Sequence, residues 1–452
     1  MKILVLNGSP KGRESITFQT VRYLMQRFPS ETFTTLHVGQ RIKSIERDFA
    51  EAQEALASAD LLLFSYPVYT FLAPSQLHRF IELIKEHGVD LAGKFAAQIT
   101  TSLHFYDVTA HRFLRDNCDD LGLRYLGGLS ADMEDLLKPQ GRKEAEDFFS
   151  HVLWCTGSGV IEPPHYPKQS EQPPFVPAPL APLPNAEKTV NKRVVIVADG
   201  LVPPLKGMID AFTSHAPYAV DTVDLKAFPF AGGCLGCFRC AANGTCVYKD
   251  GFDTFLRERI QSADAIVYAF QIRDHSMGSV MKRFDDRQFC NGHRTVTMGK
   301  PVGYLISGAL EREPNLSLLI EARAEVGGNY LAGVATDERD PSAAIDRLTK
   351  NLGYAMETGF LPPKTFYGVG GMKVFRDLIW QMRGLMREDH RFYQQHGFYD
   401  FPQKRKGRIV GMYLVGAMMR SKSIQKKIGS RMTEGMLLPY EKVLKEAEEN
   451  EK

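Results

Sequence analysis

Four cysteines lie within thirteen residues of this 452-residue sequence, at Cys234, Cys237, Cys240 and Cys246. Their spacing, C-x2-C-x2-C-x5-C, lets one short loop surround a compact inorganic group with four thiolates. Iron–sulfur clusters are commonly held by closely spaced cysteines, so the pattern favours a [4Fe–4S] cluster and electron transfer. Structural zinc sites more often take two pairs of ligands from separate turns. Zinc, or a cysteine-rich loop that holds no metal, are the two alternatives.

The composition is that of an ordinary globular protein, with 44% hydrophobic and 24% charged residues and a net charge of +3. The remaining cysteines, Cys118, Cys155 and Cys290, are scattered, and we interpret them as buried thiols. The longest apolar run, from Ile409 to Met419, has eleven residues, whereas a spanning helix needs about 20. The first apolar run is too short for a signal peptide. We expect a cytoplasmic protein, with a peripheral position at the membrane as a second option.

A second set of candidate residues follows the first predicted strand, Lys2–Leu6. The loop there is rich in small, hydroxyl and basic residues and opens onto a helix predicted at Thr17–Arg27. Helix N-termini attract phosphate, and hydroxyl groups complete such a cradle. The loop lacks the Gly-x-Gly-x-x-Gly of dinucleotide folds and the Gly-Lys-Ser/Thr of triphosphate loops, so a mononucleotide flavin fits best. The alternative is an ordinary turn with Ser15 as the helix cap.

A proline-rich segment divides the chain. Nine of the 25 prolines fall between Pro163 and Pro184, which excludes a helix and favours an extended linker. We predict a first domain at 1–160, the linker at 161–192, a second domain at 193–355, and a basic, methionine- and aromatic-rich extension at 356–452.

The two domains have the same order of signals. Apolar strands alternate with helical stretches in both, which indicates a parallel sheet covered on two faces. The predicted fold class is therefore α/β, with two tandem flavodoxin-like, doubly wound parallel-sheet domains and a helical C-terminal extension. In this fold the ligand site lies at the carboxyl ends of the strands.

Two motifs resemble the NAD(P)H-dependent FMN reductases of the flavodoxin-like superfamily: Gly-Ser-Pro-Lys, ending at Lys11, and Tyr-Pro-Val-Tyr-Thr-Phe, ending at Phe71. The cysteine loop resembles that of their iron–sulfur flavoprotein branch. The resemblance covers roughly residues 1–150 and 193–350. It implies FMN contacts from three groups: Ser9, Lys11, Ser15 and Thr17 at the phosphate; Pro67, Val68, Tyr69, Thr70 and Phe71 along the ring; and Thr100, Thr101, Ser102 and His104 on its other side.

The two copies depart from the family in complementary ways. The second lacks the phosphate cradle and carries Asp199 instead, and the first lacks the cysteines. The chain thus resembles a fused dimer, a pseudo-dimer in which the cluster of one half faces the FMN of the other; further oligomerisation stays open. His104, Tyr106 and His275 can donate protons but are more often structural, so catalytic residues stay unassigned.

The resemblance implies an FMN- and [4Fe–4S]-dependent oxidoreductase. NADH, NADPH or a reduced carrier would be the donor, and a small molecule or a protein the acceptor. The alternatives are a non-enzymatic electron carrier that feeds a partner reductase through the basic C-terminal extension, and a scaffold that has lost its cofactors.

The extension carries a local charge excess, with 15 Lys/Arg and 4 Asp/Glu between Lys364 and Arg431. We predict helices near Val374–Arg387 and Arg408–Met432. A basic surface with aromatic and methionine side chains fits an acidic protein partner or an anionic membrane. The plainer reading is a helical brace that packs on the two domains. No nucleic acid partner is expected, because no recognised module accompanies the charge.

Overall fold

The computed structural model describes residues 1–166, 173–418, 420, 437, 440–441 and 443–447. Its contacts divide the chain into two units, Met1–Phe392 and Tyr393–Lys452. In the part of the chain that the structure describes, every helix is too short or too polar to cross a membrane.

The first half contains a five-stranded parallel sheet in the order β2-β1-β3-β4-β5. The strands are β1 Lys2–Asn7, β2 Thr32–Leu36, β3 Leu61–Pro67, β4 Phe95–Ser102 and β5 Arg124–Asp132. The helices are α1 Ile16–Arg27, α2 Val38–Arg47, α3 Ala50–Ser58, α4 Ser75–Glu86, α5 Asp107–Asp120 and α6 Pro139–Ser158. Alternate residues of β1 enter different cores: Ile3 packs with residues of α1 and α6, and Leu4 with residues of α4 and α5. Both faces of β1 are therefore buried, which explains its nearly unbroken apolar run.

The second half repeats this topology with the order β10-β9-β8-β6-β7. Its strands are β6 Val190–Ala198, β7 Tyr218–Asp224, β8 Ala265–Gln271, β9 Pro301–Ser307 and β10 Tyr330–Thr336. Its helices are α7 Leu205–His215, α8 Arg239–Asn243, α9 Phe252–Phe255, α10 Gly278–Arg287, α11 Pro314–Gly327 and α12 Pro341–Thr358, with a short π-helix at Leu256–Gln261. Two flavodoxin-like domains in tandem are confirmed. β6 begins at Val190, three residues before the predicted start of the second domain at residue 193.

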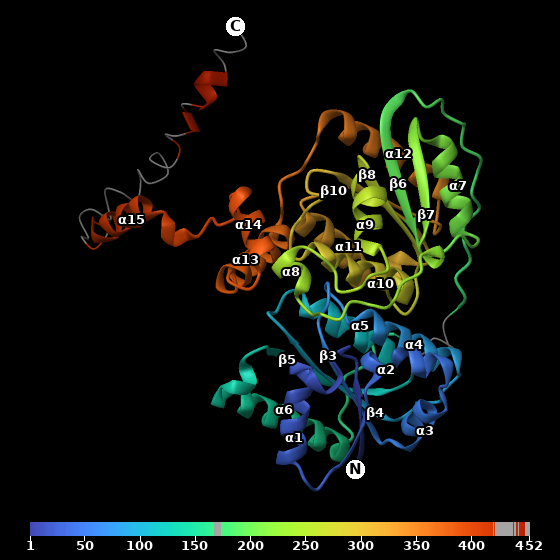
Figure 1. The fold of residues 1–452 in the computed structure, drawn as a ribbon, viewed down its shortest axis with the longest axis vertical. Coiled ribbons are helices and arrows are strands. Elements are labelled where there is room, and N and C mark those ends of the chain that lie inside the picture. Colours follow the sequence, from blue (N-terminus) through green and yellow to red (C-terminus); the bar gives the residue numbers. More distant parts are fainter. Residues whose placement is uncertain (167–172, 419, 421–436, 438–439, 442, 448–452) are drawn as a thin grey trace. The chain divides into compact units, whose positions relative to one another are not determined.

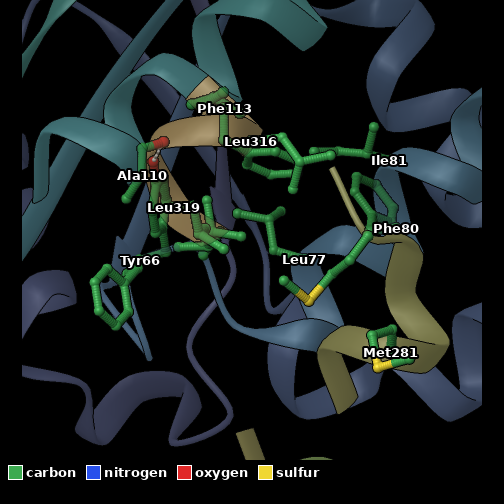
Figure 2. Packing of buried hydrophobic residues seen from close by; sticks show 14 of the residues in the cluster. Tyr66, Leu77, Phe80, Ile81, Ala110, Phe113, Met281, Leu316 and Leu319 are labelled. Atoms are coloured by element: carbon green, nitrogen blue, oxygen red, sulfur yellow. Dashed lines mark hydrogen bonds between the residues drawn. The ribbon is translucent and has the colours of Figure 1, made fainter. Parts of the chain in front are cut away.

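One continuous apolar core joins the two halves. It extends from Leu77 and Phe113 in the first half to Met281 and Leu316 in the second (Figure 2). The helices that meet there are α4 and α5 on one side and α10 and α11 on the other (Figure 1).

Two carboxylates bind helix starts across this interface in a reciprocal way. Glu82 of α4 accepts a hydrogen bond from the Ser279 amide at the start of α10, at 2.7 Å. Asp286 of α10 accepts one from the Ser75 amide at the start of α4, at 2.8 Å. A carboxylate at a helix N-terminus satisfies an orphan amide and complements the helix dipole. The halves therefore meet through an approximately two-fold arrangement, as in a dimer of similar subunits.

The extension is helical, as predicted, but its helices differ in their bounds. They are α13 Phe366–Gln381, α14 Arg387–Gln395 and α15 Lys406–Met418. The helix predicted at Val374–Arg387 in fact begins at Phe366, because Thr365 caps it by accepting a hydrogen bond from the Tyr367 amide. Most of the stretch after Met418, including 421–436, lies outside the described residues.

Candidate functional site

The loop between β1 and α1 is built around the start of a helix that has no side-chain cap. Ser15 occupies the N-cap position, as the alternative interpretation expected, but its hydroxyl makes no capping hydrogen bond. Asn7 orders the loop: its Nδ2 donates to the Gly12 carbonyl at 2.8 Å and its Oδ1 accepts from the Ser9 amide at 3.1 Å. Ser9, Ser15 and Thr17 are buried. An anion at this helix start would meet amide and hydroxyl groups together.

The loops after β3 and β4 contain backbone conformations that are rare for residues with side chains. Thr70 and Phe71 have φ angles of 47° and 73°, and His104 has 55°. Such left-handed residues carry strain and cluster at ligand-binding sites. Two hydrogen bonds between the backbones of Tyr69 and Leu72, at 2.8 and 3.1 Å, close the turn after β3. The turn fixes where the Tyr69 side chain can go.

The cysteine loop follows β7 and lies between the two halves of the molecule. All four of its cysteines are free thiols; Cys237 is exposed, and the other three are partly buried. The Sγ of Cys234 accepts a hydrogen bond from the Gly236 amide at 3.4 Å. Burial raises the pKa of Cys234 above its usual range and that of Cys240 to about 11. Without a positively charged partner, these groups are therefore thiols at neutral pH; a bound metal would take them as thiolates.

Arg287, at the end of α10, holds this loop from inside. Its guanidinium donates to the Gly232 carbonyl at 2.9 Å and to both carboxylate oxygens of Asp250 at 2.8 Å. It also lies over the Tyr248 ring, 4.4 Å from the centroid, and its Nη2 is 4.0 Å from the Cys246 Sγ. The side chain is only 1% exposed. Both ends of the cysteine loop are thus tied to one buried cation.

We expect Arg287→Ala to lower the free energy of unfolding by about 3–5 kcal/mol, because it leaves the buried carboxylate of Asp250 without its partner. Burial raises the pKa of Asp250, but the bonds from Arg287 outweigh burial and lower it to about 2. Denaturant unfolding measures the change. Arg339→Ala is the control: its ion pair with Glu311 is exposed, 78% and 58%, and is worth about 0–1 kcal/mol. Equal stability of the two variants would contradict the structural role of Arg287.

One cavity of about 370 Å³ joins the predicted flavin residues to the cysteine loop. Fifteen of the seventeen predicted site residues line it: Ser9, Lys11, Ser15, Thr17, Pro67, Val68, Tyr69, Thr70, Phe71, Thr101, Ser102, Cys234, Cys237, Cys240 and Cys246. Residues that are far apart in the sequence are therefore brought to a common space.

Tyr69 brings the two groups of residues close together. Its Oη lies where a side chain on Gly236 would begin: a Cβ built there would be 2.0 Å away. Gly236 has a φ of 61°, so only glycine meets both the conformation and the space. Next to it, Gln76 donates a hydrogen bond to the Cys234 carbonyl at 3.3 Å. The Pro67–Phe71 turn of the first half thus touches the cysteine loop of the second.

Two predicted residues, Thr100 and His104, do not line the cavity. Thr100 is fully buried and its Oγ1 is 2.8 Å from Nε2 of His111. His104 is turned toward Asp107, with 2.8 Å between Nδ1 and a carboxylate oxygen, and its side chain is half exposed. Thr100 and Thr101 are neighbours in β4 and point to opposite faces of the sheet, so Thr100 is directed to His111 and Thr101 to the cavity. Ser102, the last residue of the strand, also lines the cavity.

The corresponding place in the second half is filled by ion pairs. Asp274 and His275 have φ angles of 52° and 58°, as Thr70 and Phe71 do in the first half. His275 lies 3.0 Å from Glu313 and 3.2 Å from Asp120. Burial lowers the pKa of His275, but its bonds to these two carboxylates outweigh burial and raise it to about 10. The second half thus keeps the turn, but the charged side chains of His275, Glu313 and Asp120 occupy the space beside it.

Asp199 lies where the second half has the counterpart of the loop between β1 and α1. Its amide bonds to the end of β8 just as the Gly8 amide bonds to the end of β3, so Asp199 occupies the position of Gly8. Its side chain is 7% exposed, and burial raises its pKa to about 6. A carboxylate in place of a glycine is unsuited to a phosphate. Asp199 thus makes the β6–α7 loop unsuited to an anion, unlike the loop between β1 and α1.

The sequence interpretation missed several lining residues. Cys290, which we read as an ordinary buried thiol, lines the cavity, and its pKa is raised to about 12, first by burial and further by other groups that include Cys246 and Cys240. It is 44 residues from Cys246 and belongs to no motif, so the spacing gave no signal for it. Phe105, which directly follows His104 in the loop after β4, also lines the cavity.

Helix α13 forms one wall of the cavity, which no sequence pattern indicated. The ring of Phe375 stacks on Phe105, with centroids 4.1 Å apart, and the Tyr106 hydroxyl donates to the Tyr367 carbonyl at 2.6 Å. The same helix packs along α11. Its lining residues are Val374, Phe375, Leu378 and Met382. The start of the extension thus acts as a brace between the two halves and closes the cavity on one side.

Replacing Phe375 and Leu378 together by Ala should open this wall and let solvent reach a flavin bound in the cavity. We expect quenching of flavin fluorescence by iodide to rise about twofold or more, because closed sites exclude water and solutes. Val369→Ala is the matched control, since Val369 lies on the same helix, is 43% exposed and does not line the cavity. Unchanged quenching in the double variant would show that α13 does not shield the site.

Comparison with known proteins gives the same fold. Residues 1–110 match the family model described as flavodoxin-like fold. The chain is 26% identical over 176 residues to an iron–sulfur flavoprotein of Archaeoglobus fulgidus, a match that covers 36% of this chain and 79% of that protein. The resemblance to this group of proteins is thereby confirmed, and the two parallel sheets of the structure fit two tandem copies.

Solved structures similar to this chain include an FMN-dependent NADH-azoreductase from Bacillus anthracis, with 17% identity, 33% of this chain and 98% of that chain covered, and a TM-score of 0.28. General stress protein 14 from Treponema denticola, solved in complex with FMN, is another. It shows 15% identity, covers 34% of this chain and 98% of its own, and has a TM-score of 0.27.

Proposed function

We propose that this chain, which joins two tandem flavodoxin-like domains resembling FMN reductases and iron–sulfur flavoproteins, is an FMN- and [4Fe–4S]-dependent oxidoreductase. It would move electrons between NADH, NADPH or a reduced carrier and an acceptor. The observation that carries the proposal is the single cavity of about 370 Å³ shared by the flavin-type loops and the four cysteines. Electron transfer between two cofactors requires that they lie close together, and this cavity would hold both.

The first half supplies what FMN needs. The uncapped start of α1 and the buried hydroxyl groups of Ser9, Ser15 and Thr17 suit the phosphate. The Pro67–Phe71 turn and the opposite loop around Ser102 suit a planar ring between them. When bound, a flavin exchanges hydride equivalents and single electrons, and an iron–sulfur cluster passes electrons one at a time. The residues of this chain would bind and orient the two groups and exclude water from between them.

The cysteines suit a cluster better than a single zinc ion. Among the described residues, only Asp116, Asp119 and His165 place three potential ligand atoms within 4.8 Å of one another; the cysteine sulfurs do not. Four sulfurs at about 2.3 Å from one tetrahedral zinc would have to lie closer than that to each other. A cubane spreads its ligands over four irons. The arrangement of Cys234, Cys237, Cys240 and Cys246 therefore favours the larger group.

A second candidate function is that of an electron carrier without substrate turnover. Cys237 is the exposed member of the four. A cluster held there would have one edge open to solvent, where a redox partner protein can approach. In this case the flavin would receive the electrons, and the exposed edge of the cluster would pass them on to the partner protein. Nicotinamide would play no part.

Two measurements test these proposals. Anaerobically purified protein should show flavin and broad iron–sulfur absorption, with about four irons and no zinc per chain. Steady-state consumption of NADH or NADPH with an artificial acceptor then separates the enzyme from the carrier. Cofactors without any turnover would favour the carrier, and protein that binds neither FMN nor iron would contradict both.

A further inference from the structure

Helix α15, Lys406–Met418, presents its apolar side chains to solvent. None of its residues is buried. From Ile409 onward it contains only apolar residues and glycine, and the large side chains are widely exposed: Tyr413 is 76%, Leu414 63% and Met412 60% accessible. Large exposed apolar patches mark interaction sites in soluble proteins. This helix therefore needs a covering surface.

The apolar side chains surround the helix instead of forming one stripe. At about 100° per residue, the large residues point in directions spread round the whole circumference. They are Ile409, Val410, Met412, Tyr413, Leu414, Val415 and Met418. A helix that docks in a protein groove uses one apolar face with anchors at i, i+3 and i+4 and keeps the opposite face polar. A helix that is apolar all round is typical of one that lies deep in a core or in lipid.

Positive charge flanks the apolar run on both sides. Lys404, Arg405, Lys406 and Arg408 precede it, and Arg420 follows. From Phe401 to Arg431 the sequence has nine Lys/Arg and no Asp/Glu, although the whole chain carries only +3. Such clusters beside an apolar segment complement the negative surface potential of anionic lipid.

The length of the helix decides how it can meet a membrane. Thirteen residues at 1.5 Å each extend about 20 Å, against a hydrocarbon core of about 30 Å. α15 is therefore too short to span the bilayer. Its basic flanks would instead stay among the headgroups while its apolar residues enter the outer part of the acyl region.

We propose that α15, together with its flanking basic residues, anchors the protein peripherally to an anionic lipid bilayer. The apolar run supplies the buried surface, and the cations on both sides select anionic over neutral headgroups. This inference does not depend on which cofactors the first unit binds.

The test is co-sedimentation of the full chain with vesicles of phosphatidylcholine alone and of phosphatidylcholine mixed with phosphatidylserine. We expect binding to the mixed vesicles only, weakening as salt is raised to about 0.15 M, where charges are screened beyond about 8 Å. One variant changes Lys404, Arg405, Lys406 and Arg408 to Gln. Its affinity should fall roughly fivefold for each charge removed.

A second variant, Leu414→Asp with Val415→Asp, keeps the cations and destroys the apolar surface. Its binding should fall about tenfold or more even at low salt, which separates insertion from simple electrostatic adsorption. The charge-matched control replaces four exposed cations of the first unit by Gln: Lys138, Lys143, Lys206 and Arg339. This control should bind vesicles as the unchanged protein does.

Three results would overturn the proposal. The first is no binding to anionic vesicles, or equal loss in the charge-matched control. The second is a concentration-dependent dimer that Leu414→Asp dissociates in the absence of vesicle binding, which would make a second copy the covering surface. The third is a lower free energy of unfolding in Leu414→Asp without any vesicle binding, which would show that the chain covers the helix itself.

Discussion

Cys237→Ser is expected to remove most of the iron from anaerobically prepared protein, which otherwise should contain about four atoms per chain. A cubane needs a ligand at each corner, and a serine hydroxyl at neutral pH is a poor substitute for a thiolate. Cys237 is the best position for the test because it is exposed, so its replacement leaves the packing of the loop unchanged. Iron analysis and the broad visible absorption measure the loss.

Cys155→Ser is the control for this experiment. Cys155 is a buried free thiol on α6 and does not line the cavity, so its replacement should affect stability but not the iron content. If the unchanged protein contains one zinc ion instead of iron, or if iron is bound equally well by Cys237→Ser, the cluster assignment is wrong. Cys290→Ser extends the series, since this fifth thiol lines the same cavity.

The sheet strands and the local motifs could be predicted from the sequence because each depends on neighbouring residues. A strand buried on both faces is a continuous apolar run, as in Leu61–Pro67. The four cysteines of one loop can be recognised from their spacing in the sequence. The pairing of Gly236 with Tyr69 was not visible, although both lie in predicted motifs, because it depends on how two domains meet.

Other features of the site arise only from the folded chain. Arg287 had no distinguishing pattern, yet it holds both ends of the cysteine loop through Gly232 and Asp250. Phe375 comes from the extension, which the family resemblance does not cover, and it becomes a cavity wall by stacking on Phe105. Thr100 and His104 were carried over from the resemblance with their neighbours, whereas in the folded chain Thr100 points to the opposite face of β4 and His104 turns toward Asp107.

FMN is expected to bind at one site per chain, and a double change of Ser9 and Ser15 to Asp should release it. Each carboxylate would face the phosphate where hydroxyl groups now lie, and like charges brought together cost several kcal/mol, roughly a hundredfold or more in affinity. Titration of the apoprotein with FMN, followed by fluorescence quenching, measures the constant and the stoichiometry.

Because Ser9 and Ser15 are buried, the double variant can also lose stability. Lys11→Glu avoids this problem, since Lys11 is exposed: it removes a cation from the same loop and should weaken FMN binding while the unfolding transition stays unchanged.

Asp199→Ser is the matched change in the second half. There the carboxylate occupies the position of Gly8, and ion pairs of His275 fill the adjoining turn, so removing one charge does not create a flavin site. Asp199→Ser should therefore leave FMN binding as it is, whereas two FMN per chain in the unchanged protein would show that the second half also binds flavin.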